Sequence, residues 1–184
     1  MQRHDGLPRA FDLARWSYYL DFVLVPPAVL GLLWVAAGLE LPGLRIAGLF
    51  AGGIVAWSLA EYWIHRVVLH GGSAFGAMHE LHHRLPRDFI GVASWGTFLG
   101  FAIVWLAVAG LRGAAEASAL VGGAMTLYLF YCAIHISIHH HAGRGFGRYG
   151  ALMLRLHHGH HRGGHGNFGV SSPLWDAVFG TWRS

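Results

Sequence analysis

The sequence has no lysine, a single cysteine and little charge of either sign. Of its 184 residues only 12% are charged, whereas soluble domains contain about a quarter. Apolar residues make up 54% and aromatic residues 14%, which excludes a disordered chain and indicates a membrane protein. A single cysteine cannot form a disulfide within the chain. Cys132 lies inside an apolar run, so we interpret it as a small apolar residue.

The positive charge comes from arginine alone, and the arginines are spread between the apolar segments. A nucleic-acid-binding surface would require basic residues gathered on one face or in one run, so we expect no nucleic-acid partner. The chain also lacks a nucleophile elbow, a Walker loop and a catalytic carboxylate pair. Residues 145–150 (GFGRYG) fit G-x-G-x-x-G, but they follow a histidine-rich helical segment instead of a strand, which favours a connector over a nucleotide site.

Four apolar runs are long enough to cross the roughly 30 Å hydrocarbon core of a bilayer as helices. Short polar turns at residues 40–45 and 112–116 would join them into two hairpins. We therefore predict an all-α integral membrane protein, with one domain over residues 1–184 and a histidine-rich helical cap formed by residues 65–89 and 139–184. The predicted spans are residues 22–39, 46–64, 90–111 and 117–138.

The arginines predict the orientation of these spans. With four spans both termini lie on one side, and that side would carry eleven of the thirteen arginines. Only Arg45 and Arg112 would lie opposite. By the positive-inside rule, both termini and the cap are cytoplasmic, and we expect a bacterial inner membrane. The arginines on the cytoplasmic side would be Arg3, Arg9, Arg15, Arg66, Arg84, Arg87, Arg144, Arg148, Arg155, Arg162 and Arg183.

Fifteen histidines are several times the ordinary number, and fourteen lie at or beyond the ends of the second and fourth spans. They occur in the segments HRVVLH (65–70), HELHH (79–83), HISIHHH (135–141) and HHGHH (157–161). Intervals of three and four residues place side chains on one face of a helix, so each of the last three segments can present its imidazoles to one point. These intervals select His79, His82, His83, His135, His139, His157, His160 and His161.

The interval of five between His65 and His70 does not fit a straight α-helix. Either the helix ends or bends after Leu69, as Gly71 and Gly72 would allow, or the two histidines bind different metals. Ten imidazoles are too many for one ion and suit two. Metal ions would hold them neutral, since ten crowded imidazoles cannot all be protonated. Imidazole is compatible with iron, zinc, copper and nickel.

The ordered motifs HRVVLH, HELHH, HISIH and HHGHH, followed by NFGVSSPLWDAVFGTW, resemble the fatty acid hydroxylase and sterol desaturase superfamily over about residues 61–182. NFGVSS is most similar to the fatty acid 2-hydroxylase branch. The resemblance implies two iron ions, replaceable by zinc in purified protein, with dioxygen as co-substrate, a lipid substrate, and electrons from an external carrier and its reductase. The ligands it implies are His65, His70, His79, His82, His83, His135, His139, His157, His160 and His161.

Two carboxylates are candidates to support these ligands. Glu61 lies one helical turn before His65, and Asp176 lies in the closing motif. Either carboxylate can accept an imidazole N–H, although an interfacial carboxylate and a helix-capping aspartate are equally compatible. Residues 167–169 (Asn-Phe-Gly) predict a turn that packs the tail beneath the site.

Three alternatives to an acyl-lipid hydroxylase remain open at this stage. A carotenoid-ring hydroxylase and a sterol-type desaturase would use the same chemistry. A non-enzymatic membrane metal-binding protein would need polar residues tracing a path across the spans. Only Glu61 and His135 approach that description, and both lie near span ends.

The arginine distribution yields a topological prediction. Reporter fusions at Pro42 and at the C-terminus should report opposite sides of the membrane, the C-terminal one cytoplasmic, because three spans separate these positions. Activity of paired phosphatase and fluorescent-protein fusions measures this. The same reading from both positions would require a different number of spans.

Overall fold

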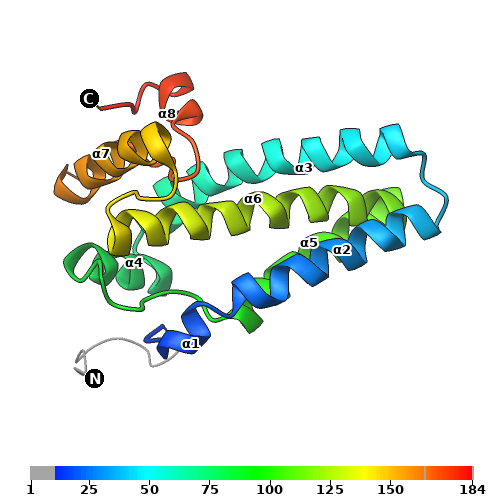
Figure 1. Ribbon diagram of the computed structural model, residues 1–184, viewed down its shortest axis with the longest axis horizontal. Helices are drawn as coiled ribbons and strands as arrows, with labels where there is room; N and C mark the ends of the chain where they lie inside the picture. The colour runs from blue at the N-terminus through cyan, green and yellow to red at the C-terminus, as the bar shows by residue number, and fades with distance from the viewer. Residues whose placement is uncertain (1–10, 164, 184) are drawn as a thin grey trace. The chain divides into compact units, whose positions relative to one another are not determined.

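The computed structural model describes residues 11–163 and 165–183, which are almost entirely helical (Figure 1). Arg3 and Arg9, which contributed to the predicted orientation, lie outside the described residues. The helices are α1 (Arg15–Tyr18), α2 (Asp21–Gly38), α3 (Gly43–Trp63), the π-helix η1 (Ile64–Leu69), α4 (Ala74–Arg84), α5 (Ser94–Arg112), α6 (Ala114–His141), α7 (Gly147–Gly163) and α8 (Leu174–Val178). They divide into two compact units, the first of Met1–Tyr18, Ala60–Ala93 and Tyr131–Ser184, the second of Tyr19–Leu59 and Ser94–Phe130.

Four helical segments are long and apolar enough to cross a membrane, which confirms the predicted multi-pass all-α fold. They are Arg15–Gly38, Gly43–Leu69, Ser94–Arg112 and Ala114–His141. The third begins later than the predicted residue 90 because Ile90 pairs with Asp12 in an isolated antiparallel bridge. That bridge holds the chain extended just before Ser94. The second and fourth segments continue past the predicted ends, so both carry histidines on their last turns.

The second unit is held together at one end by a shared carboxylate. Glu116 accepts hydrogen bonds from Arg45 of α3 and, at 3.0 Å, from Arg112 of α5. These are the two arginines predicted to lie opposite the others. Gly113 joins α5 to α6 as a one-residue turn with φ of +88°, a left-handed conformation that favours glycine.

Helices α3 and α6 approach closely at small residues. A Cβ on Gly53 would lie 1.9 Å from the carbonyl oxygen of Leu120, and one on Gly123 would lie 1.9 Å from that of Phe50. Helices in lipid lack a hydrophobic drive to associate, so close backbone packing at small residues supplies much of their attraction. This packing fixes α3 and α6, the two helices that continue into the histidine segments.

Adjacent glycines on α3 provide a matched test of this packing. Gly53→Ala should lower the melting temperature in detergent by several degrees, because its methyl group overlaps Leu120 and overpacking costs about 1–3 kcal/mol. Gly52→Ala should leave it unchanged or raise it, since a Cβ there meets nothing within 4 Å. Equal effects of the two substitutions would contradict the close contact.

Candidate metal centre

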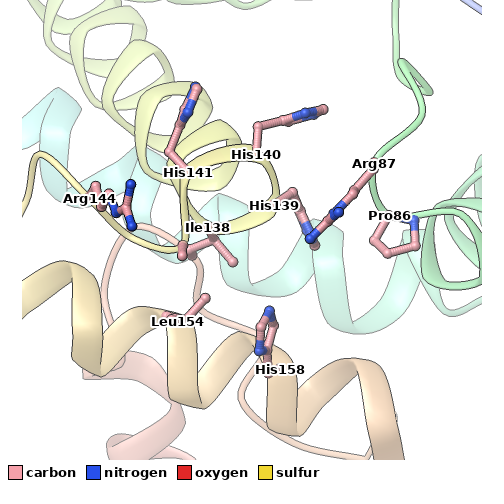
Figure 2. A pocket seen from close by; sticks show the side chains of 10 residues that line it. Pro86, Arg87, Ile138, His139, His140, His141, Arg144, Leu154 and His158 are labelled. Carbon is pink, nitrogen blue, oxygen red and sulfur yellow. The ribbon is translucent and has the colours of Figure 1, made fainter.

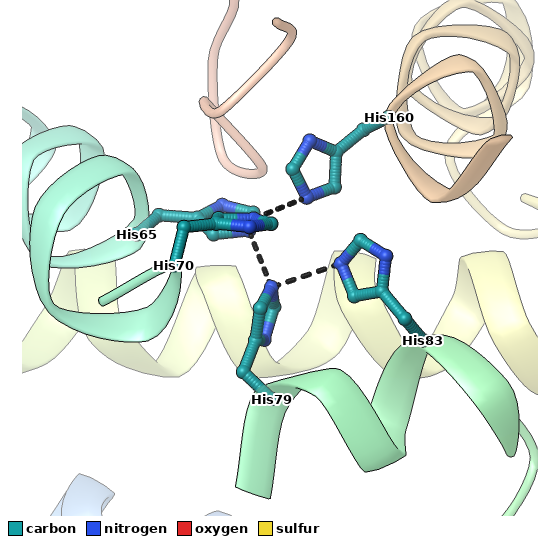
Figure 3. Close-up of side chains that lie close together, drawn as sticks. All are labelled: His65, His70, His79, His83 and His160. Carbon is teal, nitrogen blue, oxygen red and sulfur yellow. Dashed lines mark hydrogen bonds between the residues drawn. The ribbon is translucent and has the colours of Figure 1, made fainter. Parts of the chain in front are cut away.

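Two sets of histidines converge within the first unit, and we name them group A and group B. Within each group, one nitrogen from every imidazole lies within 4.8 Å of the others. Figure 3 shows the rings of group A, drawn from η1 and its end, α4 and α7, turned toward a common point. Group A contains His65, His70, His79, His83 and His160, and group B contains His82, His139, His157 and His161.

The spacing of the nitrogens in group A fits a shared ion. Nε2 of His79 lies 3.0 Å from Nε2 of His65 and 3.0 Å from Nε2 of His83. Nε2 of His70 lies 3.1 Å from Nε2 of His160. Imidazole binds zinc at about 2.1 Å, so neighbouring ligands on one ion lie about 3 Å apart. The observed separations have this value.

Group B has the same spacing. Nε2 of His157 lies 2.9 Å from that of His139 and 3.0 Å from that of His161. His135 is not part of group B, but its Nε2 lies 3.1 Å from Nε2 of His139. The two groups adjoin, since the rings of His83 and His161 stack with centroids 4.2 Å apart. All ten predicted histidines therefore lie in one cluster.

A π-helix explains the five-residue interval in the first histidine segment. The helix ends at Leu69, as one of the two sequence-based alternatives required, and His70 follows as its C-cap. Over Ile64–Leu69 the turns widen to the i→i+5 pattern, which brings residues five apart onto one face. The ring centroids of His65 and His70 stack 5.4 Å apart within group A. The alternative in which they serve different metals does not fit this arrangement.

Two backbone carbonyls fix the tautomers of two imidazoles in group A. Nδ1 of His65 lies 2.5 Å from the carbonyl oxygen of Phe168, and Nδ1 of His160 lies 2.8 Å from that of Gly166. A carbonyl oxygen only accepts hydrogen bonds, so each Nδ1 carries the proton. In a neutral imidazole that leaves the Nε2 lone pair, which faces the other members of the group.

The two predicted carboxylates hold the tail segment that supplies these carbonyls. Asp176 accepts hydrogen bonds from the backbone N–H groups of Phe168 and Gly169 at 2.8 and 2.7 Å. Glu61 accepts from those of Val170 and Ser171, both at 2.8 Å. Asp176 also accepts from the hydroxyl of Thr181 at 2.7 Å. The donors to both carboxylates are thus backbone amides and a hydroxyl instead of imidazoles, and the carboxylates act on His65 through the segment between them.

Asn167 completes this support. Its side-chain amide donates to the carbonyl oxygens of Leu156 and Arg183 at 3.1 and 2.9 Å, and its Oδ1 accepts from the N–H of Arg183 at 2.8 Å. The residue adopts φ of +56°, which asparagine tolerates better than most residues. The Asn-Phe-Gly segment therefore connects α7 to the end of the chain. The sequence located it but contained no signal that its carbonyls face histidines.

Burial keeps the imidazoles neutral. It is the largest cause lowering the pKa values of His79, His82 and His157 well below the ordinary range, with neighbouring histidines adding to the effect. The same two causes lower the pKa values of His83 and His160 to about 4, although the carbonyl of Gly166 opposes the shift at His160. At neutral pH the cluster is a set of uncharged nitrogen donors.

These donors fit metal ions. Nε2 of His82 is buried among the other nitrogens of group B and has no hydrogen-bond partner among the described residues. A buried polar atom without a partner is costly, and an ion shared with His139, His157 and His161 would satisfy it. Neutral imidazoles are ligands for iron, zinc, copper and nickel, so the donor set suits the iron implied by the resemblance.

Comparison with known proteins identifies the family. Residues 50–181 match the fatty acid hydroxylase family, a region that contains every histidine of groups A and B. The chain belongs to the fatty acid hydroxylase family. As a member of this family it is an oxidoreductase, which sets aside the non-enzymatic alternative.

Relatives of this hydroxylase include the dihydroceramide fatty acyl 2-hydroxylase FAH2 of Arabidopsis thaliana, 29% identical over 95% of this chain and 79% of that protein. The ceramide very long chain fatty acid hydroxylase scs7 of Schizosaccharomyces pombe is 30% identical over 89% of this chain and 50% of that one. The chain thus spans about half the length of the fission-yeast protein. A solved structure of scs7p, in which only the hydroxylase domain is visible, superposes with a TM-score of 0.80 at 26% identity, covering 91% of this chain and 67% of that chain.

The hydrogen bonds of Asp176 predict unequal effects on the two groups. Asp176→Asn replaces one acceptor oxygen with an NH₂ group, which releases the N–H of Phe168 or Gly169 and displaces the carbonyl that fixes His65. Loss of such support weakens metal binding about 10–100-fold. After dialysis against a weak chelator, metal content should fall from two ions per chain toward one.

A surface carboxylate provides the control for this measurement. Among the described residues, Glu80 forms a salt bridge with Arg84 alone, on the exposed face of α4, so Glu80→Gln should retain both ions. Circular dichroism would establish that both variants are folded. A folded Asp176→Asn protein that keeps two ions would show that the tail does not support group A.

Proposed function

We propose that this protein hydroxylates the acyl chain of a lipid near its carbonyl group, at two iron ions held by groups A and B. One observation carries the proposal: two adjoining sets of neutral, inward-facing imidazoles occur in a chain of the fatty acid hydroxylase family. His65, His70, His79, His83 and His160 would hold one ion. His82, His139, His157 and His161, with His135 beside them, would hold the other.

The bound metal would supply activation of dioxygen, with one oxygen atom entering a C–H bond and the other leaving as water after uptake of two electrons and two protons. The residues of the chain provide the environment for this chemistry. Six of the ten histidines are buried, which keeps water from most of the donor nitrogens: His65, His79, His82, His139, His157 and His160. The carbonyls of Phe168 and Gly166 hold two imidazoles in the ligating tautomer.

The position of the histidines along the chain supports a lipid substrate. His65 and His70 occur at the end of the second apolar segment, and His135 and His139 at the end of the fourth. A lipid could keep its tail in the hydrocarbon layer while the carbons near its head group reach the metals. Several large apolar side chains on the spans are highly exposed, as lipid-facing residues are, among them Trp34 at 77% and Leu111 at 84%.

The named relatives favour an acyl chain over the carotenoid and sterol alternatives. FAH2 of Arabidopsis thaliana is a dihydroceramide fatty acyl 2-hydroxylase, and scs7 of Schizosaccharomyces pombe is a ceramide very long chain fatty acid hydroxylase. We infer that the acyl carbon next to the carbonyl is the position attacked. Electrons would come from a separate carrier and its reductase, and the arginine distribution supports cytoplasmic termini.

Isotope labelling tests the reaction. Iron-loaded protein in lipid nanodiscs, supplied with ¹⁸O₂, dithionite and an acyl lipid, should form a product heavier by one labelled oxygen atom. Fragmentation in a mass spectrometer should place the hydroxyl next to the carbonyl. Label entering from H₂¹⁸O instead would refute an oxygenase, and a labelled hydroxyl far from the carbonyl would refute the proposed position.

Two histidine variants test whether the cluster carries the activity. His82→Ala should reduce turnover at least 100-fold, because it removes a buried nitrogen of group B. His165→Ala should retain at least half of it, because that imidazole is exposed and belongs to neither group. Equal losses would mean that histidine content, and not the arrangement in groups A and B, determines the activity.

A further inference from the structure

A basic pocket of about 500 Å³ opens beside group B, between the end of α6, the middle of α7 and the loop after α4 (Figure 2). None of the residues that line the pocket belongs to group A. Its remaining lining residues are small or apolar, and it contains no carboxylate. The polar lining residues are Arg87, His139, His140, His141, Arg144 and His158.

The charge of this pocket is not compensated within the described part of the chain. No salt bridge involves the guanidinium of Arg87 or Arg144 among residues 11–163 and 165–183, whereas Arg45, Arg84 and Arg112 each pair with a glutamate. Two free guanidinium groups beside a concave surface attract carboxylates and other anions. The pocket therefore selects a negatively charged occupant.

His139 connects the pocket to the metal centre. Its side chain forms part of the pocket wall, and its Nε2 lies 2.9 Å from Nε2 of His157 in group B. An occupant of the pocket is thus separated from the donor nitrogens of group B by a single imidazole. A site that only bound an anion would need no such connection, whereas a site for electron delivery would.

We propose that this pocket is the docking site of an acidic one-electron carrier protein, whose surface carboxylates bind Arg87 and Arg144. The proposal rests on the proposed hydroxylase function. That reaction consumes one dioxygen, one C–H bond, two electrons and two protons, and yields one hydroxyl group and one water. Two reduced carriers, each oxidised by one electron, supply the electrons, and His139 lies on the path they take.

An anionic lipid head group fits the surroundings less well. Three segments line the pocket: the loop after α4, the histidine-rich end of α6, and α7. These segments come after the apolar stretches of the spans in the chain and are not part of those stretches. His140 and His141 continue α6 beyond its apolar run, and His158 belongs to α7, a helix too polar to be a candidate span. This composition is typical of a water-facing surface.

Binding measurements test the docking site directly. With an acidic [2Fe–2S] ferredoxin as the probe and the holoenzyme in neutral-lipid nanodiscs, wild type should bind in a salt-sensitive manner. Arg87→Glu combined with Arg144→Glu should raise the Kd about tenfold or more, and Arg87→Gln with Arg144→Gln should raise it less. Arg148→Glu combined with Arg155→Glu makes an equal charge change at exposed positions outside the pocket and should shift the Kd less than twofold.

Turnover separates docking from the reaction itself. The ratio of ferredoxin-driven to dithionite-driven hydroxylation should fall at least tenfold in the double glutamate variant, at unchanged metal content. Failure of wild type to bind the ferredoxin, or an equal effect of Arg148→Glu combined with Arg155→Glu, would overturn the docking site. The docking site would also be overturned if the double glutamate variant bound ferredoxin normally but lost its preference for phosphatidylglycerol vesicles, which would assign the pocket to lipid.

Absence of dithionite-driven hydroxylation in wild type would instead refute the proposed function, and the binding result would stand independently.

Discussion

Crowding of uncharged imidazoles is the constraint on which the rest of the structure depends. Nitrogens about 3 Å apart cannot all carry protons toward one another, so most must present lone pairs inward. Each such imidazole then carries its proton on the other nitrogen, which requires an acceptor outside the cluster. The carbonyls of Phe168 and Gly166 meet this requirement for His65 and His160. The tail is therefore part of the metal centre although it contributes no ligand.

The two groups differ in how well this requirement is met. Group A has two imidazoles with carbonyl partners, whereas Nδ1 of His157 in group B is buried without a partner among the described residues. A buried N–H without an acceptor costs about 1–3 kcal/mol. The surroundings therefore orient the imidazoles of group B less firmly than those of group A. The orientation of the group B imidazoles depends more on the bound ion. Its member His139 also forms part of the wall of the open pocket, which no member of group A lines.

The parts of this fold that could be predicted are those that follow from local spacing. Intervals of three and four residues identified the histidines of α4, α6 and α7, and apolar length identified four spans, because both depend on helix geometry alone. The π-helix over Ile64–Leu69 could not be predicted, since six residues of ordinary composition contain no signal for wider turns. Nor could the carbonyls of Gly166 and Phe168, because every residue has one and only the folded tail determines which faces a histidine.

Glu61 shows why ligand positions and the tail are interdependent. It lies on α3, one turn before His65, and binds the amides of Val170 and Ser171. His65 in turn donates to Phe168 in the same tail segment. One helix end therefore holds the tail at two points, and the tail holds a ligand of that same helix in its tautomer. A buried carboxylate depends on such donors, and Oε2 of Glu61 already has no partner among the described residues, so undocking of the tail would leave Oε1 without one as well. Assembly of group A and docking of the tail therefore support each other, because undocking would remove both the amides from Glu61 and the carbonyl from His65.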